Sequence, residues 1–521
     1  MFIKGVSYLA DLHTHLMGCG DWKFWKTRAN AADDTYLTDT DLYYLGLPDI
    51  FRGRPISVPE FAKRLGQSAL RDLFIMRCPS SFADFEKRFF LRKRLVTAHP
   101  HILADLIEAE ARKQAEGGVG YVEYSLGGEL VEQRYRTSIL EGARRAERLG
   151  VYVRFLAAFR RQDSRLVWHD QPMNPQTERG RDAIRELLSK LEERPEERLA
   201  WLEGARFSDG YIDYSAQLQR LAMLDSLFKN GDSDSERLSR LIVGLDLMGS
   251  EDGYPWIPFV EPTFQDWIKH QRNDRPHFGI RIHLSEGISP GDDYGHSHLR
   301  MGLDAAYVLV ENVECPVRFG HGLGTIWMPE EAFLRVQARN VERVGRPLAS
   351  EVGTSTAKEQ FFREFRRFGW EMNISSNYLL QSYTGTTARN SKEYAFLHPV
   401  ILAVCVAFPV TLGSDDPGIF GIDGLLGEYQ LLLSALRLDP DNPDYAKMMR
   451  MSQREWLAYH MSFLACSGFS LAFASEEDRK QIPGFGQTQL IRHIRDTLVS
   501  PRSFFPGERI IRSLPRFLLD P

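Results

Sequence analysis

Eight short apolar runs, rich in β-branched and aromatic residues, are spaced along this chain of 521 residues. Turn residues lie near their ends, which is the pattern of strands buried on both faces of a sheet. The runs are 8–16, 120–126, 151–159, 241–249, 278–286, 317–322, 370–377 and 409–416. Because such strands need helices over both faces, this pattern restricts the chain to the α/β class of folds.

Amphipathic segments lie between many of these runs, with apolar residues at helical spacing and charged residues on the other face. The clearest are 102–117, 134–149, 330–343 and 356–368. Alternation of strand and helix predicts a closed (β/α)₈ barrel, the TIM barrel. An open doubly wound sheet is the alternative, but polar motifs at the ends of both the first and the last run favour closure.

Three segments fall outside the alternation, and we expect them to decorate a single domain that covers 1–521. They are insertions at about 17–80 and 160–240 and a mainly helical extension at about 425–521. Further helical stretches are expected at 58–70 and 82–96. Within the second insertion the charged run 192–198 predicts a solvated helix and turn, and the Gly-Asp-Ser cluster 231–235 predicts a flexible loop.

Composition excludes several classes of function. Lys and Arg total 65 against 70 Asp and Glu, a formal net charge of −5, so neither nucleic acid nor a membrane is an expected partner. The sequence contains no uninterrupted apolar run of about 18 residues, which is the length that would predict a membrane span. The first residues lack the apolar core of a signal peptide, and the five cysteines contain no Cys-x-x-Cys. We therefore expect a reduced, cytoplasmic protein.

Four of the apolar runs end in polar motifs, and a barrel brings the carboxyl ends of its strands to one face. The motifs are Asp11-Leu12-His13-Thr14-His15, His283-Leu284-Ser285-Glu286, Gly320-His321-Gly322 and Ser414-Asp415-Asp416-Pro417. Imidazoles and carboxylates that meet there can hold one divalent cation, a catalytic acid and a base that orients water. Jointly the four motifs predict a metal-dependent enzyme.

Each motif also has a simpler interpretation. His13 and His15 are two residues apart in a strand and point the same way, yet they can be ordinary packed histidines. Glu286 in a partly dry pocket would have a raised pKa and serve as a general acid, or it can simply cap a turn. His321, between glycines that permit close approach, can orient, deprotonate or stabilise a water, or belong to a plain turn. Asp415 and its neighbour also suit an Asp-Pro turn.

Together with further segments, the motifs resemble the adenosine deaminase superfamily of metal-dependent hydrolases, which includes adenosine and AMP deaminases. The ordered match is HTH, Asp246-Leu247-Met248-Gly249, HLSEG, GHG, Ser375-Ser376-Asn377 and SDDPGIF. The resemblance implies one zinc ion per subunit, held by His13, His15, His283 and Asp415. It also implies hydrolytic deamination of an adenine ring to a 6-oxopurine, with release of ammonia.

The same resemblance implies a role for each further residue. Glu286 would protonate N1 of the purine, while His321 and Asp415 would position the attacking hydroxide. Asp416 would contact N7, and the backbone N–H of Gly249 would contact N3. The expected partner is a small adenine nucleotide or nucleoside.

The chain departs from the nucleoside-specific pattern just after the first motif. Met17 stands where those enzymes carry an aspartate for the sugar 5′-hydroxyl, which removes a charge that would repel a phosphate. Cys19 and Lys23 are spaced as in AMP deaminases, so Lys23 is expected to meet a phosphate, with help from Arg77 or the basic run 87–94. For that run, a solvated helix face is the favoured interpretation. A nucleotide substrate is therefore expected.

Other functions stay open at this stage. One is a different mononuclear metal-dependent amidohydrolase that acts on another aminated ring. Another is a catalytically silent scaffold that binds nucleotide, although the complete set of ligands argues against it. Related nucleotide deaminases of bacterial antiviral systems form large assemblies, so a homo-oligomer and a role in defence are expectations by analogy only.

Overall fold

The computed structural model of the chain describes most of its central region. The described residues are 9–47, 54–194, 196–251, 253–284, 286, 293–322, 368–380, 398, 400, 403, 409–436, 464–465, 467–482 and 484–485, with side chains except at 293–300 and 433–436. The predicted helix 330–343 lies outside these residues, as does all of 356–368 except Phe368.

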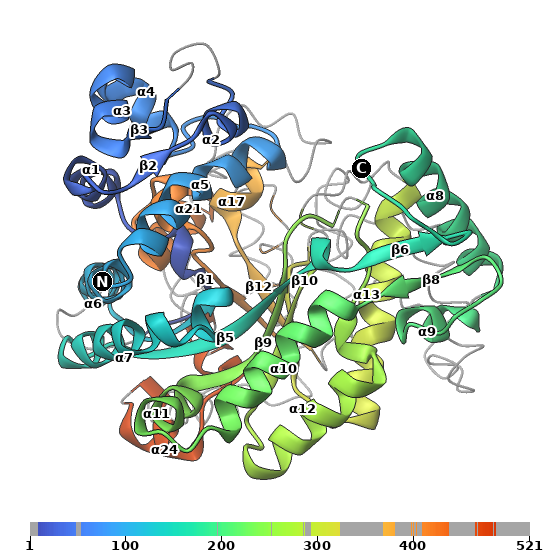
Figure 1. Cartoon of the computed structure of the whole chain (residues 1–521). Helices are drawn as coiled ribbons and strands as arrows, with labels where there is room; N and C mark the ends of the chain where they lie inside the picture. The colour runs from blue at the N-terminus through green and yellow to red at the C-terminus, as the bar shows by residue number, and fades with distance from the viewer. Residues whose placement is uncertain are drawn as a thin grey trace.

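Eight parallel strands form the centre of the molecule, and their spatial order follows the chain. They are β1 (Leu9–His15), β4 (Val119–Leu126), β5 (Tyr152–Arg160), β9 (Ile242–Met248), β10 (Gly279–Leu284), β11 (Val317–His321), β12 (Gly369–Met372) and β13 (Val410–Leu412). Each of the eight apolar runs therefore contributes a strand, as predicted. Helices surround the sheet on its outer side (Figure 1).

The sheet closes where the first and last strands meet. Thr14 and Asp415 form a parallel bridge, the Asp415 N–H donates to His13 O at 2.7 Å, and the His15 N–H donates to Asp415 O at 2.8 Å. This contact confirms the (β/α)₈ barrel and excludes the open doubly wound sheet. It also places the histidines of the first motif beside the carboxylates of the last.

The helices follow the predicted pattern closely in the described part of the chain. They are α1 (Trp22–Ala31), α2 (Asp39–Tyr44), α3 (Val58–Leu65), α4 (Gln67–Asp72), α5 (Phe82–Ala98), α6 (Ile102–Glu116), α7 (Gln133–Arg148), α8 (Glu178–Glu193), α9 (Glu197–Leu202), α10 (Ser215–Lys229), α11 (Ser233–Leu241), α12 (Pro262–Asp274), α13 (Asp293–Asn312), α17 (Ile374–Leu379), α20 (Pro417–Phe420), α21 (Gly424–Leu436) and α24 (Glu476–Gln481). None of these helices is both long and apolar enough to cross a membrane.

Two of the predicted strands are shorter than expected. β12 ends at Met372, and the second half of the run 370–377 forms α17, because Asn373 and the residues after it turn toward the barrel mouth. β13 ends at Leu412, and Asp415 has a left-handed backbone with φ of +57°. The chain therefore leaves the sheet before the functional side chains begin, which frees them to converge.

The second insertion is more ordered than predicted. The cluster 231–235 is not a flexible loop: Asp232 accepts a hydrogen bond from the Ser235 N–H at 2.8 Å and caps α11, as Asp commonly does. The run 192–198 is not wholly solvated either, because Arg198 is buried and donates to Asp304 at 2.7 Å. The insertion also contains a small antiparallel sheet that was not predicted from the sequence. It comprises β6 (Arg165–Trp168), β7 (Gln171–Pro172) and β8 (Gly210–Asp213).

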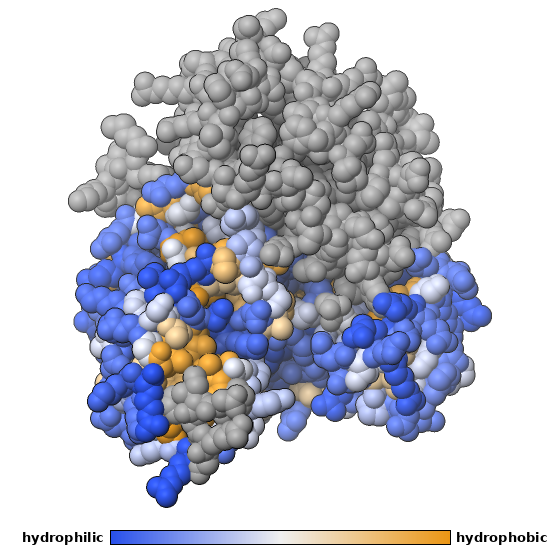
Figure 2. Space-filling view, turned by 90° about the horizontal axis from the view of Figure 1, so that it is seen from above, coloured by the Kyte–Doolittle hydropathy of each residue, from blue (hydrophilic) through white to orange (hydrophobic). Residues whose placement is uncertain are grey.

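The described surface agrees with the mixed charge of the sequence. Viewed from above, it is mostly hydrophilic, and apolar residues gather in a limited area between charged ones (Figure 2). In the first insertion, a two-stranded ribbon of β2 (Tyr36–Leu37) and β3 (Ile56–Ser57) precedes α3 and α4. This small unit lies beside α1 and α5 at one side of the barrel (Figure 1).

Candidate active site

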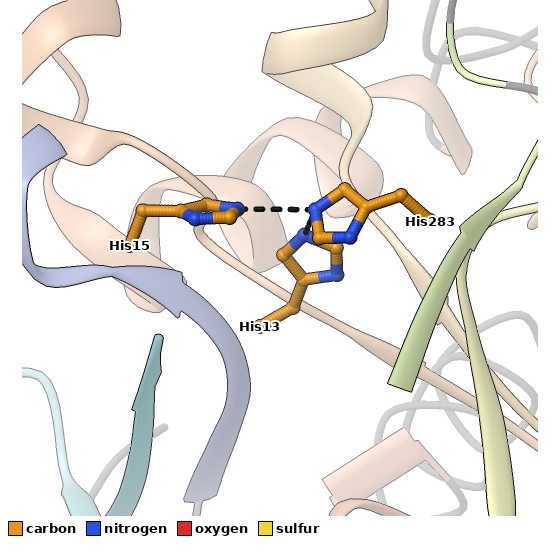
Figure 3. A group of neighbouring side chains, drawn as sticks. All are labelled: His13, His15 and His283. Carbon is orange, nitrogen blue, oxygen red and sulfur yellow. Dashed lines mark hydrogen bonds between the residues drawn. The ribbon is translucent and has the colours of Figure 1, made fainter. Parts of the chain in front are cut away.

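Three imidazoles converge at the carboxyl end of the barrel. His13 and His15 extend from β1, His283 extends from β10, and their rings point toward one another (Figure 3). The His283 Nε2 atom is 3.1 Å from the Nε2 atoms of both His13 and His15. The period of the strand places the two histidines of β1 on one side, as the sequence predicted.

In His283 and His13 the Nδ1 atom, which points away from the centre of the cluster, lies near a hydrogen-bond acceptor. These acceptors determine which ring nitrogen carries the proton. His283 Nδ1 lies 2.9 Å from the carbonyl of Leu247, and His13 Nδ1 lies 2.9 Å from Glu371 Oε2. A carbonyl can only accept, so Nδ1 carries the proton in a neutral His283 and its Nε2 carries a lone pair. The Glu371 carboxylate favours the same tautomer in His13.

Two lone pairs 3.1 Å apart repel unless a cation lies between them. Protonation is disfavoured, because burial first, and then neighbouring positive groups, hold the pKa of His13 well below its usual range. Burial lowers the pKa of His15 in the same way. Histidines that bind metal commonly donate their other N–H to a carbonyl or carboxylate, and this arrangement has that form.

Asp415 completes the donor set. Its Oδ1 is 3.3 Å from His15 Nε2 and 3.8 Å from His13 Nε2, while its buried Oδ2 has no hydrogen-bond partner among the described residues. The positive φ of Asp415 is strained for a residue with a side chain and is the kind of outlier that clusters at functional sites. Three imidazole nitrogens and one carboxylate oxygen are a donor set that suits zinc, and the residues present therefore fit the predicted metal.

Glu286 and His321 lie beside the histidine cluster. His321 Nε2 is 3.5 Å from Glu286 Oε1 and 3.9 Å from Asp415 Oδ2. Burial first, then the Asp415 and Glu251 carboxylates, raises the pKa of Glu286 well above its usual range, which favours the protonated carboxyl. The Glu286 N–H donates to Glu251 Oε1 at 2.9 Å, which fixes the backbone beneath the acid.

Glycines let the loops after the first and last strands approach closely. A Cβ at Gly18 would lie 1.6 Å from Asp416 Oδ1, and a Cβ at Gly418 would lie 2.1 Å from Gly20 O. A Cβ at Gly320 would likewise come within 2.5 Å of His13 Cε1, which confirms the close approach predicted at that glycine. The two glycines in Met17-Gly18-Cys19-Gly20 could have indicated the first two of these contacts from the sequence.

A layer of buried charges lies beneath the cluster, inside the barrel. Arg281 pairs with Asp246 at 2.8 Å and donates to Leu12 O at 2.8 Å, and Arg318 pairs with Glu123. Glu371 lies between both arginines, with Arg281 Nη1 at 3.6 Å and Arg318 Nε at 2.5 Å. Burial raises the pKa of Glu371 to about 7, and the two guanidinium groups oppose that rise. Each charge in this layer faces an opposite one.

A cavity of about 630 Å³ opens from the cluster toward α5 and α10. Its inner end is lined by His15, His283, Glu286, Asp415, Asp416 and Gly249. All six were predicted from the sequence: three as metal ligands, Glu286 as the acid, and Asp416 and Gly249 as contacts to the purine. Gly249 has a φ of +98°, which favours glycine. Its outer wall carries Phe82, Phe85, Phe89 and Phe90, and the cations Lys93, Arg160 and Arg220.

The structure does not bring Lys23 to this cavity. Lys23 lies on an exposed part of α1 and is not among the described residues that line the space, and Arg77 is exposed and paired with Asp72. Met17 does line it. The correction has a physical cause: Asp21 caps α1 at Phe24 N and starts a helix, which turns Lys23 outward.

The basic run 87–94 divides between core, surface and cavity. Arg92 is fully buried and donates to the carbonyls of Met17, Cys19 and Phe74 at 3.1, 2.7 and 2.9 Å, so it holds the loop after β1 in place. Lys93 faces the cavity. The expectation that this run is merely a solvated helix face is therefore wrong for these two residues.

Comparisons with known proteins give weak likenesses. The sequence matches no protein-family model and no curated protein. Solved structures that resemble it include an adenine deaminase from Arthrobacter aurescens, with 13% identity, a TM-score of 0.45 and coverage of 94% of this chain and 100% of that chain. A zinc-bound amidohydrolase from Burkholderia ambifaria has 13% identity, a TM-score of 0.43 and coverage of 92% and 91%.

A triazine hydrolase from Arthrobacter aurescens shows 12% identity, a TM-score of 0.35 and coverage of 84% of this chain and 66% of that chain. Likenesses this weak assign neither a fold nor an activity. The barrel is established by its own strand topology, and the donor cluster by its own side chains.

Proposed function

We propose that the chain is a zinc-dependent hydrolase that removes the 6-amino group of an adenine nucleotide or nucleoside. The observation that carries the proposal is the convergence of His13, His15, His283 and Asp415 beside the buried carboxyl of Glu286, at the closed end of a cavity. The ordered resemblance to adenosine and AMP deaminases supports the choice of substrate ring.

Four side chains of this chain would bind the metal ion. His13, His15, His283 and Asp415 would hold the ion, with His13 and His283 oriented by Glu371 and the carbonyl of Leu247. When bound there, zinc acts as a Lewis acid that makes a water molecule nucleophilic at neutral pH. All four side chains are buried.

The remaining residues act on the ring. Glu286 gives its proton to N1, which makes C6 more electrophilic. Burial, and then the adjacent Asp415 carboxylate, raises the pKa of Asp416 well above its usual range, which favours a protonated form that donates a hydrogen bond to N7. The Gly249 N–H donates to N3. A C–O bond forms at C6 and the C–N bond breaks, so one water is consumed and ammonia leaves.

The outer wall of the cavity supports a phosphorylated substrate. Lys93, Arg160 and Arg220 come from α5, β5 and α10 and line the same space. Arg160 is paired with Glu86 at 2.9 Å, whereas Lys93 has no ion pair among the described residues. Burial first, and then the charge of Arg160, lowers the pKa of the Lys93 ammonium. Arg220 lies 3.9 Å from Asp163, so Lys93 is the cation of this wall that we propose, in place of Lys23, as the contact for a phosphate.

One assay tests the reaction. Zinc-loaded protein is given adenosine, deoxyadenosine, AMP, dAMP, ATP, adenine and an aminotriazine, and hypoxanthine-type absorbance and ammonia are followed. Turnover of adenine nucleotides or nucleosides is the expected result. Turnover of the triazine alone would replace the substrate by another aminated ring, and no turnover of any compound, with zinc bound, would overturn the enzyme proposal.

A matched pair of variants tests the phosphate group. Lys93→Met should raise the KM for AMP about tenfold and leave that for adenosine unchanged, because a charge-assisted hydrogen bond contributes about 1.5–3 kcal/mol. Lys87→Met is the control, since Lys87 lies on the same helix, pairs with Asp84 at 3.1 Å and does not line the described cavity. Equal effects of the two variants would remove Lys93 from this role.

A further inference from the structure

A chain of hydrogen bonds lies behind His321, on the side away from the cavity. The Val400 N–H donates to His398 Nδ1 at 3.2 Å, and His398 Nε2 is 3.1 Å from Asn377 Oδ1. Asn377 Nδ2 is in turn 2.9 Å from His321 Nδ1. The three side chains are buried.

The direction of this chain is fixed at its outer end. A backbone N–H can only donate, so His398 Nδ1 must accept from Val400 and present a lone pair. Burial lowers the pKa of His398 to about 3, which keeps the ring neutral. In a neutral ring with a bare Nδ1, Nε2 carries the proton, and it therefore donates to the oxygen of Asn377.

The orientation of the amide then decides the state of His321. With its oxygen occupied by His398, Asn377 presents its NH₂ group to His321 Nδ1, which must accept. Asn373 acts in the opposite sense. Its NH₂ group faces the carbonyls of Met372 and Gly413 at 3.3 and 3.0 Å, which turns its oxygen toward His321 Nδ1 at 3.3 Å. The contact from Asn377, at 2.9 Å, is the shorter of the two, and the inference follows from it.

We infer that Asn377, oriented by His398, is a positioning residue that holds His321 with its proton on Nε2. That nitrogen is buried, faces Glu286 Oε1 and Asp415 Oδ2, and has no hydrogen-bond partner among the described residues. His321 is therefore a donor to the reacting oxygen and not a base that removes its proton. It stabilises negative charge that develops there, in the manner of an oxyanion hole.

The left-handed backbone of His321 serves the same purpose. Its φ of +66° is uncommon for a residue with a side chain, and the ring lies between the Asn377 amide at Nδ1 and the Glu286 and Asp415 carboxyl groups at Nε2. A general base would need an Nε2 atom without a proton, whereas the hydrogen bonds from Val400 through His398 and Asn377 place the proton of His321 on Nε2. The inference rests on the proposed function for its chemical meaning, but the protonated nitrogen can be observed without any substrate.

The test reads the tautomer directly. Protein labelled with ¹⁵N-histidine, both zinc-loaded and metal-free, is examined by ¹H–¹⁵N ring correlation spectra, with His321 assigned by its loss in His321→Phe. The expected spectrum has a proton-bearing Nε2 and a bare Nδ1. Because a carboxylate can only accept, Asn377→Asp should move the proton to Nδ1. A bare Nε2 in the wild-type spectrum would overturn the inference.

Kinetics of the zinc-loaded protein give a second readout. Asn377→Asp should lower kcat by roughly 10²–10⁴-fold with little change in KM, as expected when an imidazole is held in the wrong tautomer. His398→Gln, which keeps a donor for the Asn377 oxygen, should retain activity that His398→Leu loses. Unchanged tautomer and kcat in Asn377→Asp, in protein with wild-type zinc content and melting temperature, would contradict the inference. If no substrate turns over, the spectra still decide it, so its failure is distinguishable from failure of the proposed function.

Discussion

Two layers at the end of the barrel are built from similar polar groups but treat them differently. In the lower layer, Arg281 and Arg318 face Asp246, Glu123 and Glu371, and every charge has an opposite neighbour. In the upper layer, imidazole lone pairs meet at 3.1 Å, and the buried Asp415 carboxylate has no ion pair with a lysine or an arginine among the described residues.

The difference separates stability from function. Buried charges persist when they are paired, and removal of one partner is costly because the other remains buried and uncompensated. Unsatisfied buried atoms carry a cost that a ligand can relieve. The lower layer therefore holds the strand ends in position, and the upper layer is arranged for a metal and a reacting ring. Glu371 connects the two layers, since it contacts both Arg318 and His13.

The largest effect is expected in the upper layer. Glu286→Gln should lower kcat by about 10³-fold, the scale of general acid catalysis, because the amide cannot give a proton to the ring. Its melting temperature and zinc content should match those of the wild-type protein. Glu132→Gln, a change at the outer wall of the same cavity, is the control and should retain activity. Substantial activity in Glu286→Gln would assign the acid role elsewhere.

The lower layer should show the reverse pattern. Glu123→Gln removes one of the two carboxylates that buried Arg318 faces, so the free energy of unfolding should fall by about 3 kcal/mol, the lower end of the cost of breaking a buried ion pair. Urea unfolding measures the loss, and kcat per folded molecule should stay within a few-fold of wild type. Exposed Glu141→Gln, which breaks ion pairs at the surface of α7, is the control and should change stability little. Equal stability of all three proteins would contradict the separation of the layers.

Removal of the metal sharpens the comparison further. A ligand that binds only the folded state at a hundred times its Kd stabilises it by about 2.7 kcal/mol. Chelation should therefore lower the melting temperature of both the wild-type protein and Glu123→Gln by a similar increment. It should not alter that of a variant with both His13 and His283 changed to Ala. An effect of chelation on that variant would place the metal elsewhere.

The last effect concerns Glu428, whose carboxylate supports the start of α17. Its carboxylate accepts from the Ile374 and Ser375 N–H groups, and burial raises its pKa from 4.5 to about 8. The folded state thus binds more protons than the unfolded chain between these values. The contribution of Glu428 to the free energy of unfolding should be fully present below pH 4.5. It should be lost as pH rises to about 8, by up to roughly 1.4 kcal/mol per pH unit. Urea titrations from pH 4.5 to 8.5 should show a weaker fall in Glu428→Gln; parallel curves would exclude Glu428 as the cause.

The strands and the donor cluster were predictable because their signals are local. A buried strand is a short apolar run, and His13 and His15 at strand spacing must share a side. The ordered motifs then placed His283, His321 and Asp415 at the same end of a barrel. Barrel closure itself, through the contact of Thr14 with Asp415, followed from the motifs on the first and last runs.

Groups that depend on long-range packing could not be found in this way. Arg92 and Lys93 are adjacent in sequence, yet one is buried against the loop after β1 and the other faces the cavity. Lys23 was placed by spacing alone, and the capped start of α1 turns it away. Glu371 and His398 act through neighbours that are distant in sequence, so no pattern in the chain marks them.

The metal content of the purified protein tests the central claim most directly. Wild type and Glu286→Gln are loaded with zinc, dialysed and measured by inductively coupled plasma mass spectrometry, beside the variant in which His13 and His283 are both Ala. The account predicts one zinc per chain in the first two proteins and none in the third. No retained zinc in the wild type, or equal zinc in all three, would contradict it.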